Sequence, residues 1–323
     1  MNEFETRIDL TQLQEAVGRV KDEIRKVIVG QEEMVDLLLA AILADGHALI
    51  EGVPGVAKTL TAKLLSKTIS VAFSRIQFTP DLMPSDVLGT QIYNLKTAEF
   101  QFRQGPIFSN IVLIDEINRS PAKTQAALFE VMEERQITVD GHTYLMDPPF
   151  LVLATQNPIE QEGTYRLPEA QLDRFLFKIE VKYPNLEDET KILTQAHQRK
   201  ANVTLADVNA VLTAEQITHY RQKVREVHVD EALLKYIAQI VNNTRNNLSL
   251  YLGASPRASL AIMNTSKAIA AMRGRDFVTP EDIKMVATPV LRHRVMLTPE
   301  REMEGLTAED VIKQILDGIE VPR

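Results

Sequence analysis

The chain has 323 residues, of which 45% are hydrophobic and 25% charged, so its length predicts about two domains with a sizeable core. The absence of cysteine excludes disulfides, thiolate metal sites and cysteine nucleophiles and fits a reducing cytoplasm. The longest apolar run, Leu37 to Ala44, is far shorter than a membrane span of about 20 residues, and the N-terminus lacks signal-peptide features. We therefore expect a cytoplasmic protein without a membrane span.

The net charge of −8 lies in the first 185 residues, which carry 18 basic and 26 acidic side chains, whereas the remainder carries 18 of each. An acidic chain without a basic stripe is a poor candidate for binding duplex nucleic acid. The charge therefore disfavours nucleic acid as a partner, although a local basic patch would be compatible with it.

The first 185 residues alternate helical and strand signals. Thr11-Gln12-Leu13-Gln14 is typical of a capping box opening a helix that ends at about residue 28, and a second helix covers about residues 31–44. Short apolar runs follow, each ended by a turn or helix, at residues 48–51, 75–78, 111–115, 150–155 and 175–181. This pattern predicts an α/β fold with a largely parallel sheet covered by helices on both faces.

Two segments interrupt this alternation. Residues 79–110 form a connection far longer than the usual 2–6 residues and contain two strand signals, which predict an inserted hairpin at about residues 88–106. An Asp140-Gly141 pair between alternating residues is a strong hairpin signal, so we expect a second hairpin at about residues 135–149. Long ordered insertions are more often functional than plain surface loops, and we favour that interpretation for both.

From about residue 186 the pattern changes, because we find no convincing strand run and helix N-cap signals recur. Pro184 stops the last strand. We therefore predict an α/β core over residues 1–185 and an all-α domain over residues 186–323. The N-cap signals fall at Thr213, Asp230, Ser255, Thr279 and Thr307.

After the first strand run, a glycine-containing loop with a Lys-Thr pair opens a helix, which is the context of a phosphate-binding P-loop. Its backbone N–H groups would cradle phosphates, Lys58 would reach the β- and γ-phosphates, and the Thr59 hydroxyl would bind Mg²⁺. Ala57 replaces the usual glycine before the lysine, and alanine can still let the backbone approach a phosphate, provided that its φ is negative. The alternative is a plain strand-to-helix turn. The predicted nucleotide-binding residues of this loop are Gly52, Val53, Pro54, Gly55, Val56, Ala57, Lys58, Thr59 and Leu60.

Polar residues end the next two long apolar runs. Asp115 would hold Mg²⁺ through water, as hard oxygen ligands do, and Glu116 would polarise the attacking water as a general base. Asn157, after the following strand, could orient that water. The alternatives are an acidic turn and a common Asn-Pro turn.

Arg257 falls in the first turn of a helix capped by Ser255, where a cation opposes the helix dipole. This indicates an anion opposite it, such as a nucleotide phosphate, although a solvated surface arginine is the alternative. Arg174 lies just before the last strand, where ion pairing with a carboxylate and catalysis are equally plausible. The roles of Arg119 and of Arg292 to Arg294 stay open, and the six histidines lack metal-ligand spacing.

Together, these sequence motifs resemble those of the MoxR family of AAA+ ATPases. An alanine at the position of Ala57 is also usual in that family. The matching segments occur in family order across nearly the whole chain. They are Val29-Gly30-Gln31, residues 52–59, 114–119, 154–158 and 167–175, and Gly253 to Arg257.

The resemblance implies a hexameric ring with ATP between neighbouring subunits. Arg174 would be an arginine finger acting in trans, as trans arginines do elsewhere, Asn157 would be sensor 1, and Arg257 would be sensor 2. The turn at Val29, Gly30 and Gln31 would lie near adenine. The two hairpins would be the helix-2 insert and the pre-sensor-1 hairpin of this clade, projecting toward the ring pore or one face.

Family members act as chaperone-like remodelers, often with a partner that carries a von Willebrand factor A domain, and help to activate other enzyme complexes or insert their metal cofactors. We therefore expect a Mg²⁺-dependent ATPase that remodels proteins whose identity the sequence does not name. One alternative is a nucleic-acid motor, which needs pore-facing cations. Residues 136–150 contain no Lys or Arg, and the first insert offers only Lys96 and Arg103. Another alternative is a non-hydrolysing nucleotide-gated scaffold. The presence of Asp115, Glu116 and Arg174 argues against it.

Overall fold

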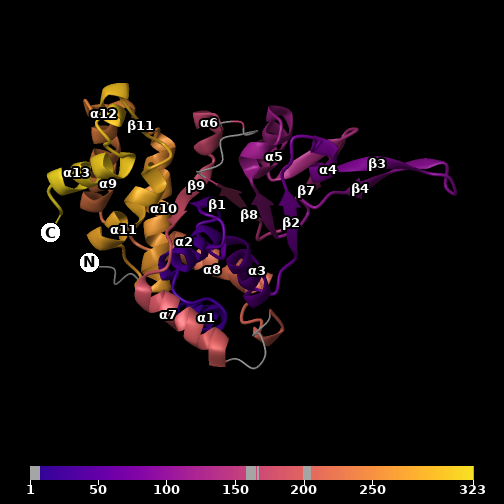
Figure 1. Ribbon diagram of the computed structural model, residues 1–323, viewed down its shortest axis with the longest axis horizontal. Helices are drawn as coiled ribbons and strands as arrows, with labels where there is room; N and C mark the ends of the chain where they lie inside the picture. Colours follow the sequence, from indigo (N-terminus) through magenta and orange to yellow (C-terminus); the bar gives the residue numbers. More distant parts are fainter. Residues whose placement is uncertain (1–7, 158–164, 166, 199–204, 323) are drawn as a thin grey trace, which may run out of the picture.

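The computed structural model describes residues 8–157, 165, 167–198 and 205–322. Figure 1 shows an α/β part built around one sheet, with a helical C-terminal part packed beside it and a long hairpin projecting from the opposite side. Among the described residues, no helix is both long enough and apolar enough to cross a bilayer.

Five parallel strands form the central sheet in the order β2-β5-β8-β1-β9. Every residue of β5 is buried, as are the first five of the six residues of β8, which is typical of strands covered on both faces. The predicted parallel sheet is confirmed, with strand ends that differ by up to two residues. The strands are β1 (His47–Gly52), β2 (Phe73–Gln77), β5 (Ile111–Asp115), β8 (Leu151–Gln156) and β9 (Phe175–Val181).

Alternate residues of these strands face two separate hydrophobic clusters. Ile111 and Leu113 of β5 belong to one cluster with α1, α2 and α3, whereas Val112 and Ile114 belong to the other with α5. This follows from the two-residue period of a strand. The helices of this part are α1 (Thr11–Arg25), α2 (Glu32–Leu43), α3 (Lys58–Thr68), α4 (Pro84–Leu88), α5 (Ala122–Glu134) and α6 (Glu169–Leu172), with a 3₁₀ turn η1 (Ile117–Arg119).

The expected capping box at the start of α1 is wrong. Thr11 is the first helical residue, and Leu10 is the N-cap. The Thr11 N–H instead donates to the carboxylate of Asp9 at 3.0 Å. A carboxylate two residues upstream thus satisfies an N–H group that the helix leaves without an internal partner. The helix also ends at Arg25, three residues earlier than expected.

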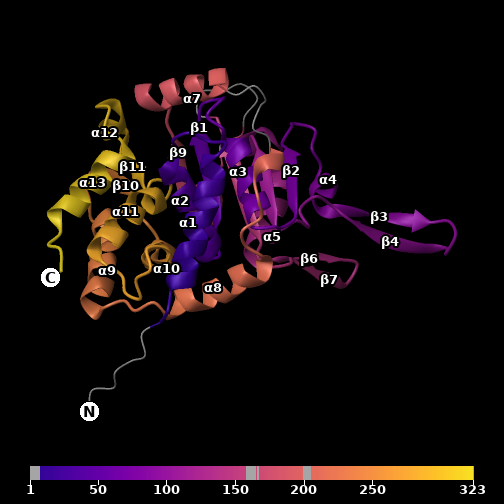
Figure 2. The same cartoon turned by 90° about the horizontal axis from the view of Figure 1, so that it is seen from below.

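Both predicted hairpins are present as antiparallel pairs, β3 (Gly89–Asn94) with β4 (Glu99–Gln104) and β6 (Gln136–Val139) with β7 (His142–Leu145). Asp140 and Gly141 have φ values of 47° and 77°, the positive values that a two-residue hairpin turn requires. Both hairpins extend to the same side of the sheet in Figure 2.

The C-terminal part is helical, and its helices share a hydrophobic cluster with α1 and α2. All five predicted N-caps are confirmed as N-cap residues. Two short strands were not predicted, because two or three residues are too few to show a pattern. The elements are α7 (Leu186–Gln198), η2 (Leu205–Asp207), α8 (Ala214–Glu226), α9 (Glu231–Arg245), β10 (Leu250–Leu252), α10 (Pro256–Met272), α11 (Pro280–Leu291), β11 (Met296–Leu297), α12 (Pro299–Met303) and α13 (Ala308–Gly318).

Candidate active site

The glycine-containing loop joins the end of β1 to the start of α3 and borders a pocket of about 400 Å³. Gly55 has a φ of +89°, which favours glycine. Gly52 lies against β9, where a Cβ atom would come within 2.8 Å of the Val181 carbonyl oxygen. Predicted loop residues that line the pocket are Pro54, Gly55, Val56, Ala57, Lys58, Thr59 and Leu60.

Ala57 adopts a left-handed backbone conformation, with a φ of 62°. The condition of a negative φ is therefore not met. Ala57 is the N-cap of α3, and its carbonyl accepts the Thr61 N–H at 2.9 Å and the Thr61 hydroxyl at 3.0 Å. A left-handed conformation costs a residue with a Cβ atom about 1 kcal/mol, so the loop holds some backbone strain at this position.

The Lys58 ammonium lies at the loop pocket and donates to the Gly52 carbonyl. Burial lowers the pKa of this ammonium, and neighbouring carboxylates, with Asp115 first, oppose that change. The side chain thus folds back over its own loop, where a bound phosphate would lie if the loop acts as predicted.

Asp115 is a buried carboxylate at the end of β5. One carboxylate oxygen accepts from Arg75 Nε at 2.6 Å, and the other accepts from the Thr155 hydroxyl at 3.1 Å. The same hydroxyl oxygen accepts the Glu116 N–H at 3.1 Å. Thr155, on neighbouring β8, therefore fixes the Asp115 side chain and the Glu116 backbone.

Glu116 follows β5 with a left-handed φ of 58°. Its Oε2 accepts from Gln77 Nε2 at 3.0 Å and pairs with Arg119 Nε at 2.9 Å. Asn157 lines the same pocket directly after β8. The structure therefore brings Asp115, Glu116 and Asn157 together with the loop, as expected from strands whose carboxyl ends share one edge of a sheet.

Sequence reasoning missed Arg75, Gln77 and Thr155 at this site. Gln77 pairs in register with Asp115 across β2 and β5, and Arg75 lies two residues away on the same side of its strand. Polar residues at alternate positions near the end of a strand are a signal that could have found the first two, but only once the strand order was known.

Arg174 and Arg257 line a different pocket, of about 320 Å³, which shares no lining residue with the loop pocket. Arg174 Nε lies 3.0 Å from Glu133 Oε2, and Arg257 Nη2 lies 2.8 Å from Glu133 Oε1. The anion expected opposite Arg257 is, within this chain, the Glu133 carboxylate. Sequence reasoning missed Glu133, since nothing distinguishes it from the neighbouring acidic residues of α5.

The turn at Val29, Gly30 and Gln31 precedes α2 and does not line the loop pocket. Gln31 Nε2 donates to the Lys182 carbonyl at 3.2 Å, and Gln31 lines a third pocket with Glu180 and Arg292. A placement of adenine at this turn therefore stays a prediction.

The sheet order, the Lys-Thr loop and the paired carboxylates define a P-loop ATPase. The model of the ATPase family associated with various cellular activities (AAA) matches residues 47–177, and the AAA lid domain model matches residues 242–315.

The chain is 44% identical to "Chaperone MoxR1" of Mycobacterium tuberculosis, covering 93% of this chain and 81% of that protein. It is 48% identical to "Uncharacterized protein YeaC" of Bacillus subtilis, covering 95% of both. A 2.00 Å crystal structure of a proposed ATPase from Cytophaga hutchinsonii is 43% identical, with a TM-score of 0.89 over 97% of each chain. The chain therefore belongs to the MoxR family of AAA+ ATPases.

Proposed function

We propose that this ATPase requires Mg²⁺, that its active site is completed by a neighbouring copy in a ring, and that its turnover remodels other proteins. The observation that carries the proposal is that Lys58, Asp115, Glu116 and Asn157 share one pocket, whereas Arg174 and Arg257 share another. One copy thus presents a nucleotide pocket and, separately, a pair of arginines.

The loop pocket supports the following division of labour. The loop N–H groups and Lys58 hold the phosphates. Glu116 accepts a proton from water whose oxygen attacks the γ-phosphorus, while Asn157 orients that water. The bond from the γ-phosphorus to the β–γ bridging oxygen breaks, and ADP and phosphate result.

The donor set at the pocket fits Mg²⁺. The Thr59 hydroxyl and the Asp115 carboxylate are hard oxygen donors in one pocket, and within the described ranges no group of three His, Cys, Asp or Glu could hold a metal by itself. Mg²⁺ usually takes one or two protein oxygens and completes its shell with water and substrate phosphates. Bound with ATP, it would neutralise charge on the phosphates.

The separation of the two pockets supports action in trans. Arg174 and Arg257 meet at Glu133, so both arginines face one place, and that place is not the pocket of their own loop. Trans arginines stabilise the charge of the transferring phosphoryl group. We infer that the pair serves the ATP of the next subunit, in the hexameric ring that the family resemblance implies.

A protein-remodelling role is supported by the relative named a chaperone. The β6–β7 hairpin carries no Lys or Arg, which weighs against a nucleic-acid motor. We further propose that the protein is cytoplasmic. Its nucleotide-binding core would cover residues 1–185 and its lid residues 186–323. Its partner would carry a von Willebrand factor A domain, and its clients would be enzyme complexes awaiting metal cofactors.

The direct test compares Glu116→Gln and Lys58→Ala with the wild-type chain. Glu116→Gln should bind ATP with an affinity close to that of the wild type but lower kcat at least about 100-fold, because a general base contributes that much. Lys58→Ala should weaken ATP binding itself. Glu130→Gln, at an exposed position of α5, is the matched control and should leave both quantities unchanged. Phosphate release near the wild-type rate in Glu116→Gln would remove Glu116 from the proposal.

A further inference from the structure

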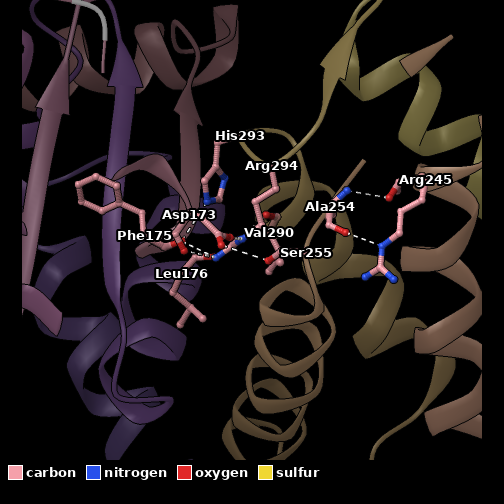
Figure 3. A network of polar contacts seen from close by, with 10 residues as sticks. Asp173, Phe175, Leu176, Arg245, Ala254, Ser255, Val290, His293 and Arg294 are labelled. Atoms are coloured by element: carbon pink, nitrogen blue, oxygen red, sulfur yellow. Dashed lines mark hydrogen bonds and ion pairs between the residues drawn. The ribbon is translucent and has the colours of Figure 1, made fainter. Parts of the chain in front are cut away.

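Arg294 is a buried arginine in the turn after α11. Its guanidinium group donates several hydrogen bonds to the residues on either side of Arg174. Nε donates to the Asp173 carboxylate at 2.7 Å, and Nη2 donates to the carbonyls of Asp173 at 3.2 Å and Phe175 at 2.6 Å. Nη1 donates to Leu176 at 3.1 Å and to Val290 of α11. Figure 3 shows these contacts between the start of β9 and the helical part.

Asp173 links the same segment to α10. Its second carboxylate oxygen accepts from the Ser255 hydroxyl at 3.1 Å. Ser255 is the N-cap of α10, yet its side chain does not cap that helix. Arg257 lies in the first turn of α10, two residues further on. The Asp173 carboxylate therefore joins the residue before Arg174 to the helix end that carries Arg257.

The start of α10 is itself fixed from α9. The Ala254 N–H donates to the Thr244 hydroxyl at 2.9 Å. The Ala254 carbonyl accepts from Arg245 Nε at 2.8 Å, as Figure 3 also shows. The Glu133 carboxylate pairs with both Arg174 and Arg257. The segments that carry the two arginines are therefore linked twice, once through Asp173 and Ser255 and once through Glu133. The residues beside each arginine in the chain are thus hydrogen-bonded, and both guanidinium groups are held by Glu133.

We propose that Arg294 is a positioning residue, which sets Arg174 and Arg257 side by side as one unit that faces the nucleotide of a neighbouring subunit. This inference rests on the proposed trans action of the two arginines. The positioning role also explains why residue 294 is an arginine, because only the planar guanidinium group offers five donors in fixed directions. A lysine keeps the charge but reaches fewer of the acceptors.

The test is Arg294→Lys in the full-length chain, assayed for kcat, KM and ATP affinity. We expect kcat to fall about 10- to 100-fold, because a displacement of about 1 Å can cost that much. KM and ATP affinity should change less than about threefold, since the loop pocket is untouched. Asp173→Asn, which keeps the side-chain volume, should show the same split and provides a second measurement if Arg294→Lys does not fold.

A matched control separates positioning from simple stability. Arg275 makes a two-bond ion pair with the fully buried Asp282, at 2.7 and 2.8 Å, and neither residue lines the arginine pocket. Arg275→Lys should destabilise the helical part but leave kcat near that of the wild type. A loss of kcat in Arg275→Lys equal to that in Arg294→Lys would overturn the inference.

The kcat of the double variant Arg174→Ala/Arg294→Lys tests whether Arg294 acts through the arginine pair. If Arg294 acts through Arg174 and Arg257, the loss of kcat in the double variant should be smaller than the product of the two single losses, because effects of coupled residues do not add. Fully additive losses, or wild-type kcat in Arg294→Lys, would overturn the inference while the trans role of Arg174 stands. Wild-type kcat in Arg174→Ala would instead overturn the proposed function.

Discussion

His47, at the start of β1, is a buried histidine with both ring nitrogens in use. Nδ1 accepts the Val152 N–H at 2.9 Å, and Nε2 lies 3.0 Å from the Met132 carbonyl, so the neutral ring with its proton on Nε2 satisfies both contacts. Burial, aided by the nearby Arg135 charge, lowers the pKa of His47 to about 4. The neutral ring therefore stabilises the fold above the ordinary pKa of 6.5, and this stability is lost as the pH falls from 6.5 toward 4.

The corresponding prediction concerns His47→Gln, which keeps a donor and an acceptor but removes the titration. Between pH 6 and pH 5 the free energy of unfolding of the wild type should fall by about 1.2 kcal/mol more than that of the variant, slightly less than the value for one full proton per pH unit. Urea unfolding at pH 7, 6 and 5 measures it. His293, whose pKa burial also lowers, is present in both proteins and cancels. Equal pH slopes would contradict the prediction.

At the residue scale, local motifs predicted several residues of the loop pocket, because each motif is a short run of residues at the end of a strand, although the pocket itself joins segments that are far apart in the sequence. Lys58 and the carboxylates at 115 and 116 lie at positions fixed by the strand and helix beside them. The left-handed φ of Ala57, in contrast, depends on the path of the whole loop. Glu133 and Arg294 act across the fold, so no local pattern distinguishes them.

The two hairpins are separate in sequence but contact each other through aromatic rings. The Phe102 ring lies 4.7 Å from that of Tyr144, centroid to centroid, and Phe108 lies 6.0 Å from Phe102 and 6.4 Å from Tyr144. A two-stranded hairpin alone is marginally stable in water. The shorter hairpin therefore supports the base of the longer one, whose Leu95 and Phe100 are exposed.

Tyr144→Ala tests this support at the scale of the element. Aromatic pairs contribute about 0.5–1.5 kcal/mol beyond the area they bury, so amide hydrogen exchange in β3 and β4 should become roughly two- to tenfold faster. Exchange in β1 and β8 should stay at the wild-type rate and serves as the internal control. Unchanged protection of β3 and β4 would show that Tyr144 does not stabilise this hairpin.

Elements with strong local signals could be predicted from the sequence. The Asp140-Gly141 turn and the buried run of β5 are examples, because turn chemistry and burial are encoded within a few residues. The strand order is not encoded in this way, since it depends on contacts between distant segments. At the start of α1, the sequence predicted that the Thr11 hydroxyl would accept from the first N–H groups of the helix. The Asp9 carboxylate accepts from one of them instead, and the local pattern does not distinguish these two oxygen acceptors.

At the scale of the whole molecule, the groups expected to act on ATP are divided between two places. Lys58 and the carboxylates border one pocket, and Arg174 and Arg257 border another with Glu133 between them. A head-to-tail contact between copies would bring the arginines of one to the loop of the next, and such contacts form a ring where the rotation between copies closes. The family resemblance predicted an active site shared between subunits, and the separation of the two pockets supports that prediction.

If one active site draws residues from two subunits, mixing two inactive variants should restore turnover. Arg174→Ala keeps an intact loop, and Lys58→Ala keeps intact arginines. Alone, each should lose nearly all phosphate release. In rings formed from an equal mixture, about one quarter of the interfaces should combine an intact loop with intact arginines, so turnover should recover toward a quarter of the wild-type value. Mixed rings that form but recover no activity would show that Arg174 does not act on the nucleotide of a neighbouring subunit.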